Sequence, residues 1–391
     1  MSGPRVLVSA ARRRAGLAAV RTLGRAGYQV ISADYAPFPL GLRSRWSVAF
    51  RVLPRPRDGT ALLETLECSG ADAVLPLDTP MVGFLATHRD RLRRRLGLAV
   101  PGREGFRVAY DKRRTAEMCQ RLDIPTPALL DEPSPRDRVV VVKPRFDVGD
   151  AQGVAYCRDG AEVAAALRNC RRYAEPMFQE YVPGGVEMMR TVVVLLDRRH
   201  RLVASFTMRK LGQFPTTGGP TTMAVSTDDP ALVEQVLPLC EASRWEGPAE
   251  VELKVDPRDG RTKVIEINPR FPAYLPFPIR CGLPLPQLCA RIALGESPSA
   301  AGHEVGRRYV HPILHLRAAW SGGAGLYGPA RRLGRAVLDL PGAFLGDGLS
   351  LADPMPRLAK MIAVCRGEMG ALVDPAGALA LDYVDDPVPR H

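Results

Sequence analysis

The 391-residue chain lacks any run of about 20 apolar residues, the length that a helix needs to cross a bilayer. Its beginning also lacks the features of a signal peptide, because the apolar stretch 5–9 is short and a cluster of arginines follows it directly. These absences argue against a membrane partner. From them we expect a cytoplasmic protein.

Cysteine pairs and interleaved aromatic residues are missing as well. The eight cysteines are scattered without a CxxC pair, which argues against the usual zinc and redox motifs. The net charge of +12 leaves open an anionic partner, either a nucleotide, an acidic substrate or nucleic acid. Only the charge supports the hypothesis of nucleic-acid binding. The arginine-rich stretch 89–95 contains no aromatic residue and is typical of a solvated helix end.

Four units are expected from the order of apolar runs. Residues 1–106 alternate strand patterns at 5–9, 29–33 and 73–76 with helical patterns at 17–26 and 59–68, which predicts a parallel sheet covered by helices. Its first turn contains only one glycine, Gly16, so the GxGxxG dinucleotide fingerprint is absent. Further units are expected at 107–190, 191–298 and 299–391, the last of them mostly helical and without an assignable motif.

The hairpin predicted at 249–268 carries an unusual set of charges. Because side chains alternate along a strand, Glu250, Glu252 and Lys254 share one face. A turn centred near residue 259 places Glu252 opposite Glu266, and Glu250 opposite Asn268. Opposed like charges destabilise a hairpin unless a cation lies between them, and carboxylate and amide oxygens suit Mg²⁺. The alternative is a surface hairpin with solvated glutamates.

Two lysines lie where the chain turns. Lys143 ends the strand pattern at 139–144 and precedes a turn containing Gly149 and Gly153, whose backbone N–H groups can approach phosphates closely. Lys112 begins a predicted helix over 111–122, where the helix dipole disfavours a cation and an anionic ligand would be welcome.

Taken as a set, these segments resemble one known family. The segment 266–270 (EINPR), the acidic strand before it, the KP turn at 143–144 and the QEYVPG segment at 179–184 resemble the ATP-grasp superfamily, and within it the carbamoyl-phosphate-synthetase-like carboxylate–amine ligases. The resemblance covers residues 5 to about 298. It implies an α/β fold with an α+β lid, in which an N-terminal Rossmann-like preATP-grasp domain precedes the ATP-grasp domains.

The resemblance also implies roles for individual residues. The phosphates of ATP would lie on Lys112 and Lys143, the adenine on Gln179, Glu180 and Val182, and the ribose on Glu187. The expected ligands of Mg²⁺, or alternatively of Mn²⁺, are Glu252, Glu266 and Asn268, with Glu250 as a further candidate. Arg270 would steady the transferred phosphate, and Arg209 and Lys210 would contact the γ-phosphate or the substrate carboxylate.

These roles predict an ADP-forming enzyme that phosphorylates a carboxylate and transfers the acyl group to an amine. Bicarbonate or a thiol acceptor, or a degenerate regulatory protein, are the alternatives, since Asp147 and Asp150 occupy the lid loop where relatives often have glycine. The segment 271–278 departs from the family pattern and predicts an apolar substrate wall. Both substrates and the oligomeric state stay open, and the resemblance allows a homodimer.

Overall fold

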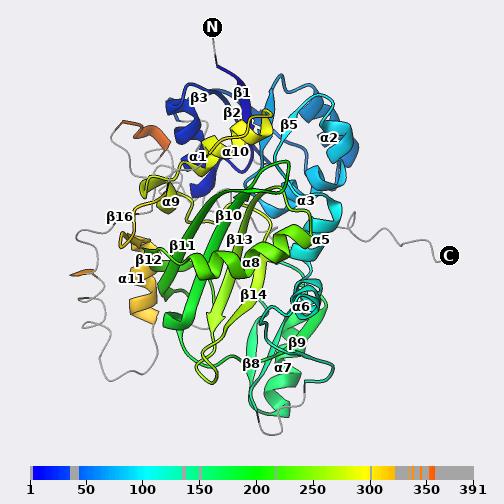
Figure 1. Cartoon of the computed structure of the whole chain (residues 1–391), viewed down its shortest axis with the longest axis vertical. Coiled ribbons are helices and arrows are strands. Elements are labelled where there is room, and N and C mark those ends of the chain that lie inside the picture. The colour runs from blue at the N-terminus through cyan, green and yellow to red at the C-terminus, as the bar shows by residue number, and fades with distance from the viewer. Residues whose placement is uncertain are drawn as a thin grey trace, which may run out of the picture.

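The computed structural model describes residues 3–35, 44–133, 138–148, 152–215, 218–299 and 302–321, together with the short stretches 334, 337–338, 344–345 and 352–356. Within these residues the strands form three sheets. Figure 1 shows them from the top of the molecule to the bottom as a parallel sheet, a long antiparallel sheet and a small lid. No helix in the described part of the chain is both long and apolar enough to cross a membrane.

The N-terminal sheet has the predicted parallel arrangement, with the strand order β3-β2-β1-β4-β5. Its strands are β1 (Arg5–Val8), β2 (Gln29–Asp34), β3 (Ser47–Val52), β4 (Ala73–Leu75) and β5 (Gly97–Leu98), and its helices are α1 (Arg14–Arg25), α2 (Gly59–Glu67), α3 (Thr79–Thr87) and α4 (Arg89–Leu92). Gly27 follows the end of α1 at a φ of +88°, a conformation that glycine adopts readily after the C-terminus of a helix.

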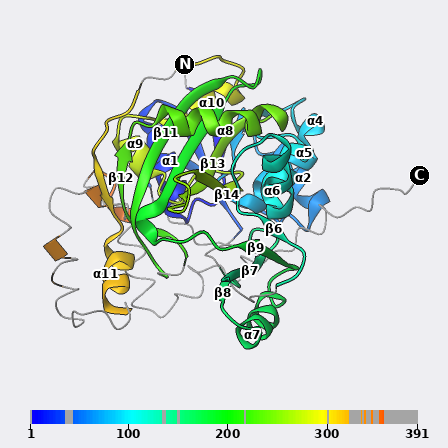
Figure 2. The ribbon, with the colours of Figure 1, turned by 60° about the horizontal axis from the view of Figure 1, so that its bottom comes forward.

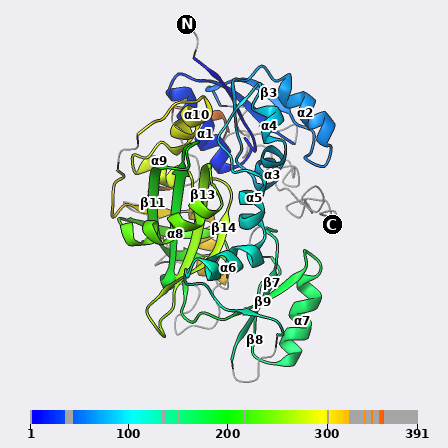
Figure 3. The same cartoon turned by 45° about the vertical axis from the view of Figure 1, so that its right-hand side comes forward.

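Two helices, α5 (Arg103–Tyr110) and α6 (Lys112–Arg121), lead from this sheet to the lid, as Figure 3 shows. The lid is a four-stranded antiparallel sheet in the order β6-β9-β7-β8, with one helix on its outer side (Figure 2). Its elements are β6 (Leu129–Leu130), β7 (Val140–Pro144), β8 (Ala155–Cys157), α7 (Gly160–Cys170) and β9 (Pro176–Glu180).

The large sheet has the order β14-β13-β10-β11-β12-β15-β16 and is antiparallel except for the parallel pair β15–β16. It follows the short 3₁₀ turn η2 (Val186–Met188) and comprises β10 (Met189–Leu196), β11 (Leu202–Gln213), β12 (Thr221–Thr227), β13 (Gly247–Val255), β14 (Thr262–Asn268), β15 (Arg308–Val310) and β16 (Phe344–Leu345). Its helices are α8 (Pro230–Ala242), α9 (Pro276–Arg280), α10 (Leu285–Ala293) and α11 (Pro312–Ser321). The described part of the last predicted unit therefore adds strands to this sheet.

Aspartates begin several of the helices. Asp78, Asp111, Asp159 and Asp229 each accept a hydrogen bond from a backbone N–H in the first turn of α3, α6, α7 and α8. A carboxylate there satisfies an N–H group that has no partner within the helix and complements the positive end of the helix dipole. The cap on α6 matters for the site, because it fixes the helix that starts at Lys112.

The two faces of the large sheet have different partners. On one face, β10 and β13 pack against α8, α5 and α6. On the other face, β10 and β11 pack against α1, α9 and α10. This second face continues past the apolar contact toward the lid, where Glu250, Glu252 and Lys254 project from β13. The sheet therefore leaves a polar floor beneath the lid.

Candidate nucleotide and metal site

The predicted hairpin has the predicted register at its acidic end. Glu252 lies opposite Glu266, and Glu250 lies opposite Asn268, on β13 and β14. All four residues line one pocket of about 510 Å³ between the lid and the large sheet. A volume of this size is within the range of small-molecule and cofactor sites.

A β-bulge changes the other residues of β14. The pairing shifts after Glu252, so that Leu253 lies opposite Val264 and Ile265 is the extra residue. An extra residue reverses the alternation of side chains. Val264 is consequently buried in the core and Ile265 lines the pocket, which is the reverse of what regular alternation from Glu266 would give.

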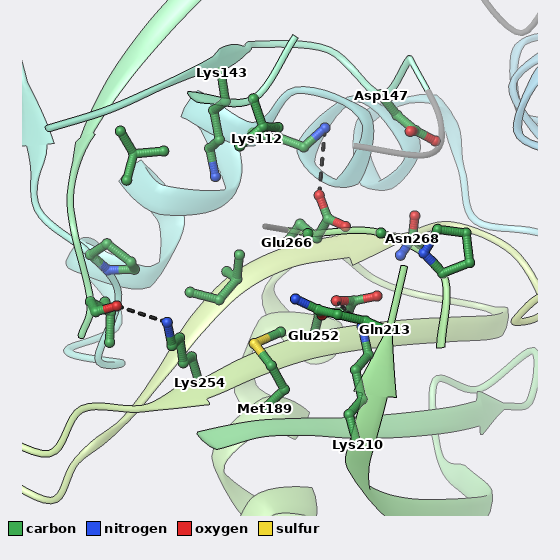
Figure 4. Close-up of a pocket in the computed structure, with 18 of the residues that line it drawn as sticks. Lys112, Lys143, Asp147, Met189, Lys210, Gln213, Glu252, Lys254, Glu266 and Asn268 are labelled. Carbon is green, nitrogen blue, oxygen red and sulfur yellow. Dashed lines mark hydrogen bonds and ion pairs between the residues drawn. The ribbon is translucent and has the colours of Figure 1, made fainter. Parts of the chain in front are cut away.

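Two lysines cover the pocket from the lid side. Lys112 lies 3.6 Å from a carboxylate oxygen of Glu266 and donates a hydrogen bond to the carbonyl of Phe146. Lys143 is 6% exposed, and its ammonium group points into the pocket (Figure 4). Among the described residues, no hydrogen bond or ion pair reaches this group. Burial and the charge of Lys112 lower the pKa of Lys143 to about 8.

The three predicted metal ligands each have a cationic neighbour. Glu252 accepts a 2.8 Å hydrogen bond from Lys210, Glu266 lies near Lys112, and Asn268 accepts a hydrogen bond from Arg270 at 3.3 Å. Nowhere among the described residues do three His, Cys, Asp or Glu side chains gather closely enough to hold a metal ion. A cation held here would therefore need phosphate oxygens to complete its coordination.

Burial shifts the pKa values of Lys210 and Glu250 in opposite directions. Burial would lower the pKa of Lys210, but Glu252 outweighs it and the pKa is raised. Burial and the nearby Glu252 raise the pKa of Glu250 to about 7. Arg270, whose guanidinium lies 3.6 Å from the Glu250 carboxylate, partly offsets that rise.

The opposite end of the pocket is lined by the last residues of the lid. Gln179 is buried near the end of β9, Glu180 is the last residue of that strand, and Val182 follows in the segment that leads to the large sheet. All three line the pocket. The Glu180 side chain points away to Arg258 and Lys263, which leaves its backbone to the pocket. The sequence did not indicate that Lys254 would donate a 2.8 Å hydrogen bond to the carbonyl of Val182.

Arg209 is wrongly placed by the sequence prediction. Lys210 lines the pocket and is 2% exposed, whereas Arg209 is exposed and lies outside the pocket lining. The two are consecutive on β11, so their side chains must point to opposite faces of the sheet. The alternation that places Glu250 and Glu252 on the same face of their strand also predicts opposite faces for the consecutive residues Arg209 and Lys210.

Two further predicted contacts do not reach the pocket lining. Glu187 is exposed and accepts a hydrogen bond from the backbone N–H of Gly185, so its carboxylate turns back onto its own loop at the rim. Gly153 has a φ of +75° and packs against Pro144, where a Cβ would come within 2.9 Å of that ring. Its conformation therefore serves the turn, while the neighbouring Gln152 lines the pocket.

The structure shows the position of one of the two acids in the lid loop. Asp147 lines the pocket and accepts a 3.1 Å hydrogen bond from the Thr79 hydroxyl of α3, which draws it to the edge of the site. Gly149 and Asp150 lie outside the described residues.

The prediction that residues 271–278 form an apolar wall of the pocket is wrong for most of the segment. Phe271, Leu275 and Phe277 are buried in the core shared with the N-terminal sheet. Of the segment 271–278, the pocket receives only Ala273 and Tyr274. The apolar residues of this segment hold two units together and contribute little to the pocket wall.

An ion pair that the sequence analysis missed joins the lid to α6. Arg145, just after Lys143, donates two hydrogen bonds of 2.9 and 2.8 Å to the carboxylate of Asp111. Asp111 also caps α6, and the backbone N–H of Lys112 donates to the carbonyl of Arg145. This contact holds the strand end carrying Lys143 next to Lys112. No sequence pattern links residues 34 positions apart in this way.

Among known proteins, no protein-family model matches the chain. The chain is 24% identical over 279 residues to the carbamoyl phosphate synthase large chain of Methanothermobacter thermautotrophicus, a match that covers 66% of this chain and 26% of that protein. The chain thus spans about a quarter of the length of that relative.

Solved structures resemble the chain over most of its length. The L-amino acid ligase from Bacillus licheniformis superposes with a TM-score of 0.60 at 18% identity and covers 76% of each chain. N5-carboxyaminoimidazole ribonucleotide synthetase, solved as an ADP complex, gives a TM-score of 0.65 at 13% identity and covers 82% of this chain and 87% of that one. The chain therefore has the ATP-grasp fold, and the fold predicted from the sequence is confirmed.

Proposed function

We propose that this chain is an ATP- and Mg²⁺-dependent ligase, which phosphorylates a carboxylate and joins the resulting acyl group to an amine. The observation that carries the proposal is the ammonium group of Lys143, which is buried, faces the pocket and has no partner among the described residues. A buried charge without a partner is costly, so an anionic ligand is expected to supply one. Lys112 next to it makes a phosphate chain a better partner than a single carboxylate.

The residues opposite these lysines fit a magnesium ion that arrives with the nucleotide. Two carboxylates and one amide oxygen, on Glu252, Glu266 and Asn268, face the lysines across the pocket. Hard oxygen ligands of this kind suit Mg²⁺, which usually keeps phosphate oxygens and water in its remaining positions. When bound, the ion would neutralise the charge of the phosphates during transfer.

The reaction requires the residues to position anions. A carboxylate oxygen attacks the γ-phosphorus, the bond to the bridging oxygen of the β-phosphate breaks, and ADP leaves. The amine nitrogen then attacks the carbonyl carbon, the bond to the phosphate oxygen breaks, and the nitrogen loses a proton. Lys143, Lys112 and Arg270 would offset the repulsion between the two anions in the first step.

The comparisons support this proposal without naming substrates. The L-amino acid ligase and the N5-carboxyaminoimidazole ribonucleotide synthetase share the fold, and the carbamoyl phosphate synthase resembles part of the sequence. Carboxylate–amine ligation accounts for a pocket that presents cations to both a phosphate chain and a second anion. Bicarbonate or a thiol acceptor would use the same first step.

The test is carboxylate-dependent ADP release in the presence of hydroxylamine, which traps an acyl phosphate as a hydroxamate. We expect ADP and hydroxamate to appear in equal amounts when MgATP is given with a suitable carboxylate, and neither to appear without one. Binding of MgATP without ADP release across a broad set of carboxylates and acceptors would favour the degenerate regulatory protein. Failure to bind MgATP would contradict the proposal altogether.

A further inference from the structure

The proposed reaction leaves one buried acid of the pocket without a role. Glu250 is 3% exposed and lines the pocket one step along β13 from Glu252. Its position opposite Asn268 puts it at the end of the acidic row, beyond the pair Glu252 and Glu266. A third carboxylate, buried where Glu252 and Glu266 are only half-buried, would weaken a neighbouring binding site for anions unless it has a task of its own.

The ion pair of Glu250 is a loose one. Its carboxylate lies 3.6 Å from the guanidinium of Arg270, which is longer than a hydrogen bond. Arg270 donates its hydrogen bonds to the carbonyl of Phe271 and to Asn268, at 3.1 and 3.3 Å. A guanidinium has five N–H donors, so both members of the pair retain capacity to bind a further group.

Two hydroxyl groups lie near Glu250. The hydroxyl of Tyr274 is buried, and the residue lines the pocket. It lies close to the Glu250 carboxylate and to the hydroxyl of Thr191 on the neighbouring strand β10, which is also buried. The phenol has one proton to donate, so its oxygen keeps lone pairs that can accept a hydrogen bond from a ligand. The corner therefore presents an anion, a cation and a hydroxyl oxygen to the pocket.

We propose that this corner binds an α-amino carboxylate, with the substrate's ammonium group on Glu250 and Tyr274 and its carboxylate beside Arg270. An ammonium group donates to both the carboxylate and the phenol oxygen, and a carboxylate accepts from the guanidinium. The adjacent opposite charges of the corner match the adjacent opposite charges of a free amino acid. Arg270 would then hold the carboxylate on the side of the pocket that contains Lys143.

This inference rests on the proposed function and narrows it to an amino acid as the activated substrate. Bicarbonate and simple carboxylic acids carry no ammonium group, so they would offer Glu250 no counter-charge beyond that of Arg270. A site built for a polar group rejects analogues that lack it far more strongly than a site built on apolar contact. The corner is thus expected to select against acids without the amine.

The experiment compares each amino acid with the acid that lacks only its amine, using hydroxylamine as the common acceptor. L-Alanine is paired with propionate, and L-phenylalanine with 3-phenylpropionate. We expect the natural chain to prefer active amino acids by about 100-fold or more in kcat/KM. In Glu250→Gln the preference should fall below about 10-fold, because the amide keeps the shape and removes the charge. The affinity for MgATP, measured by calorimetry, should change less than about threefold, which also reports that the variant is folded.

The control is Glu241→Gln, since Glu241 is exposed on α8 at the opposite face of the sheet and should leave the preference unchanged. The inference is overturned if the natural chain uses the desamino acids as well as the amino acids. It is also overturned if Glu250→Gln lowers both activities equally, as loss of a metal ligand would. Release of ADP with desamino acids alone would contradict the amino-acid subsite and still support the ligase proposal. No release of ADP with any carboxylate would contradict both proposals.

Discussion

Two clusters of buried charge differ in how completely their charges are paired. At the junction of α4 with β13, Glu246 is fully buried and forms ion pairs with Arg89, with Arg93 at 2.5 Å and with Arg198 at 4.0 Å. At the pocket, Lys143 is almost as deeply buried and has no such partner among the described residues. The charges of the first cluster are paired within the chain, whereas the charge of Lys143 is left for the proposed ligand to pair.

This difference separates a structural cluster from a binding site. The pairs of Glu246 join the N-terminal unit to the large sheet, so the stretch 89–95, expected to be solvated, is in part an internal contact. Pairing compensates the cost of burying Glu246, whereas the cost of burying Lys143 remains in the free protein. Removal of a charge should therefore destabilise the first cluster and stabilise the second.

The largest effect is expected for Glu266→Gln, which removes one of the two carboxylates facing the lysines. Turnover should fall by about 10³-fold, since the charge that would hold the metal is needed in phosphoryl transfer. Unfolding in urea should change by less than about 1 kcal/mol, because the pair with Lys112 is long and Glu266 is partly exposed. Glu104→Gln, at an exposed carboxylate, is the control. Full activity in Glu266→Gln would contradict the metal assignment.

Lys143→Met tests the unpaired charge itself. The affinity for MgATP should fall by about 100-fold through loss of a charge-assisted contact. The free protein should become more stable by about 1–3 kcal/mol, because a buried cation that forms no hydrogen bond or ion pair among the described residues is removed. Lys263→Met is the matched contrast, since this ammonium binds Asp256 at 2.8 Å and its loss should lower stability. A destabilised Lys143→Met would mean that the lysine has a partner in the free protein.

Glu246→Gln addresses the paired cluster. The free energy of unfolding should fall by about 2–4 kcal/mol, as the arginines around it lose their counter-charge; their partial exposure keeps the loss moderate. The affinity of the folded protein for MgATP should stay within about twofold, which calorimetry at low temperature can measure. A variant with normal stability and weakened binding of MgATP would contradict the structural role of Glu246 and indicate a role in nucleotide binding.

The pH dependence of nucleotide binding should follow Lys143. Its pKa of about 8 lies below the ordinary value for lysine, so above pH 8 the free protein loses the proton that a phosphate requires. Affinity for MgATP should fall by about tenfold per pH unit above pH 8, with proton uptake on binding. Stability of the free protein should rise over the same range, because the unfolded chain binds the proton more tightly. In Lys143→Met both dependences should disappear.

Local rules predicted the strands and the acidic end of the site. Alternation and turn length were enough to place Glu252 opposite Glu266, and the resemblance supplied Lys112, Lys143 and Arg270. The bulge at Ile265 was not predictable, because it depends on how the hairpin packs against α6 and the lid. The same holds for the pairs Arg145–Asp111 and Glu246–Arg93, which join residues distant in the sequence. The segment 271–278 was misjudged because composition does not show which side of a chain faces a neighbouring unit.

The smallest effect is expected at Arg209, and it contrasts with Lys210 next to it. Arg209→Ala should change kcat/KM by less than about twofold, because its side chain lies on the face of β11 that turns away from the pocket. Lys210→Met should lower kcat/KM by about 100-fold, because it leaves Glu252, a proposed metal ligand, without its 2.8 Å hydrogen bond. The ratio of these two effects tests the strand register directly. Equal losses at both positions would require both side chains to reach the pocket, which a regular strand does not allow.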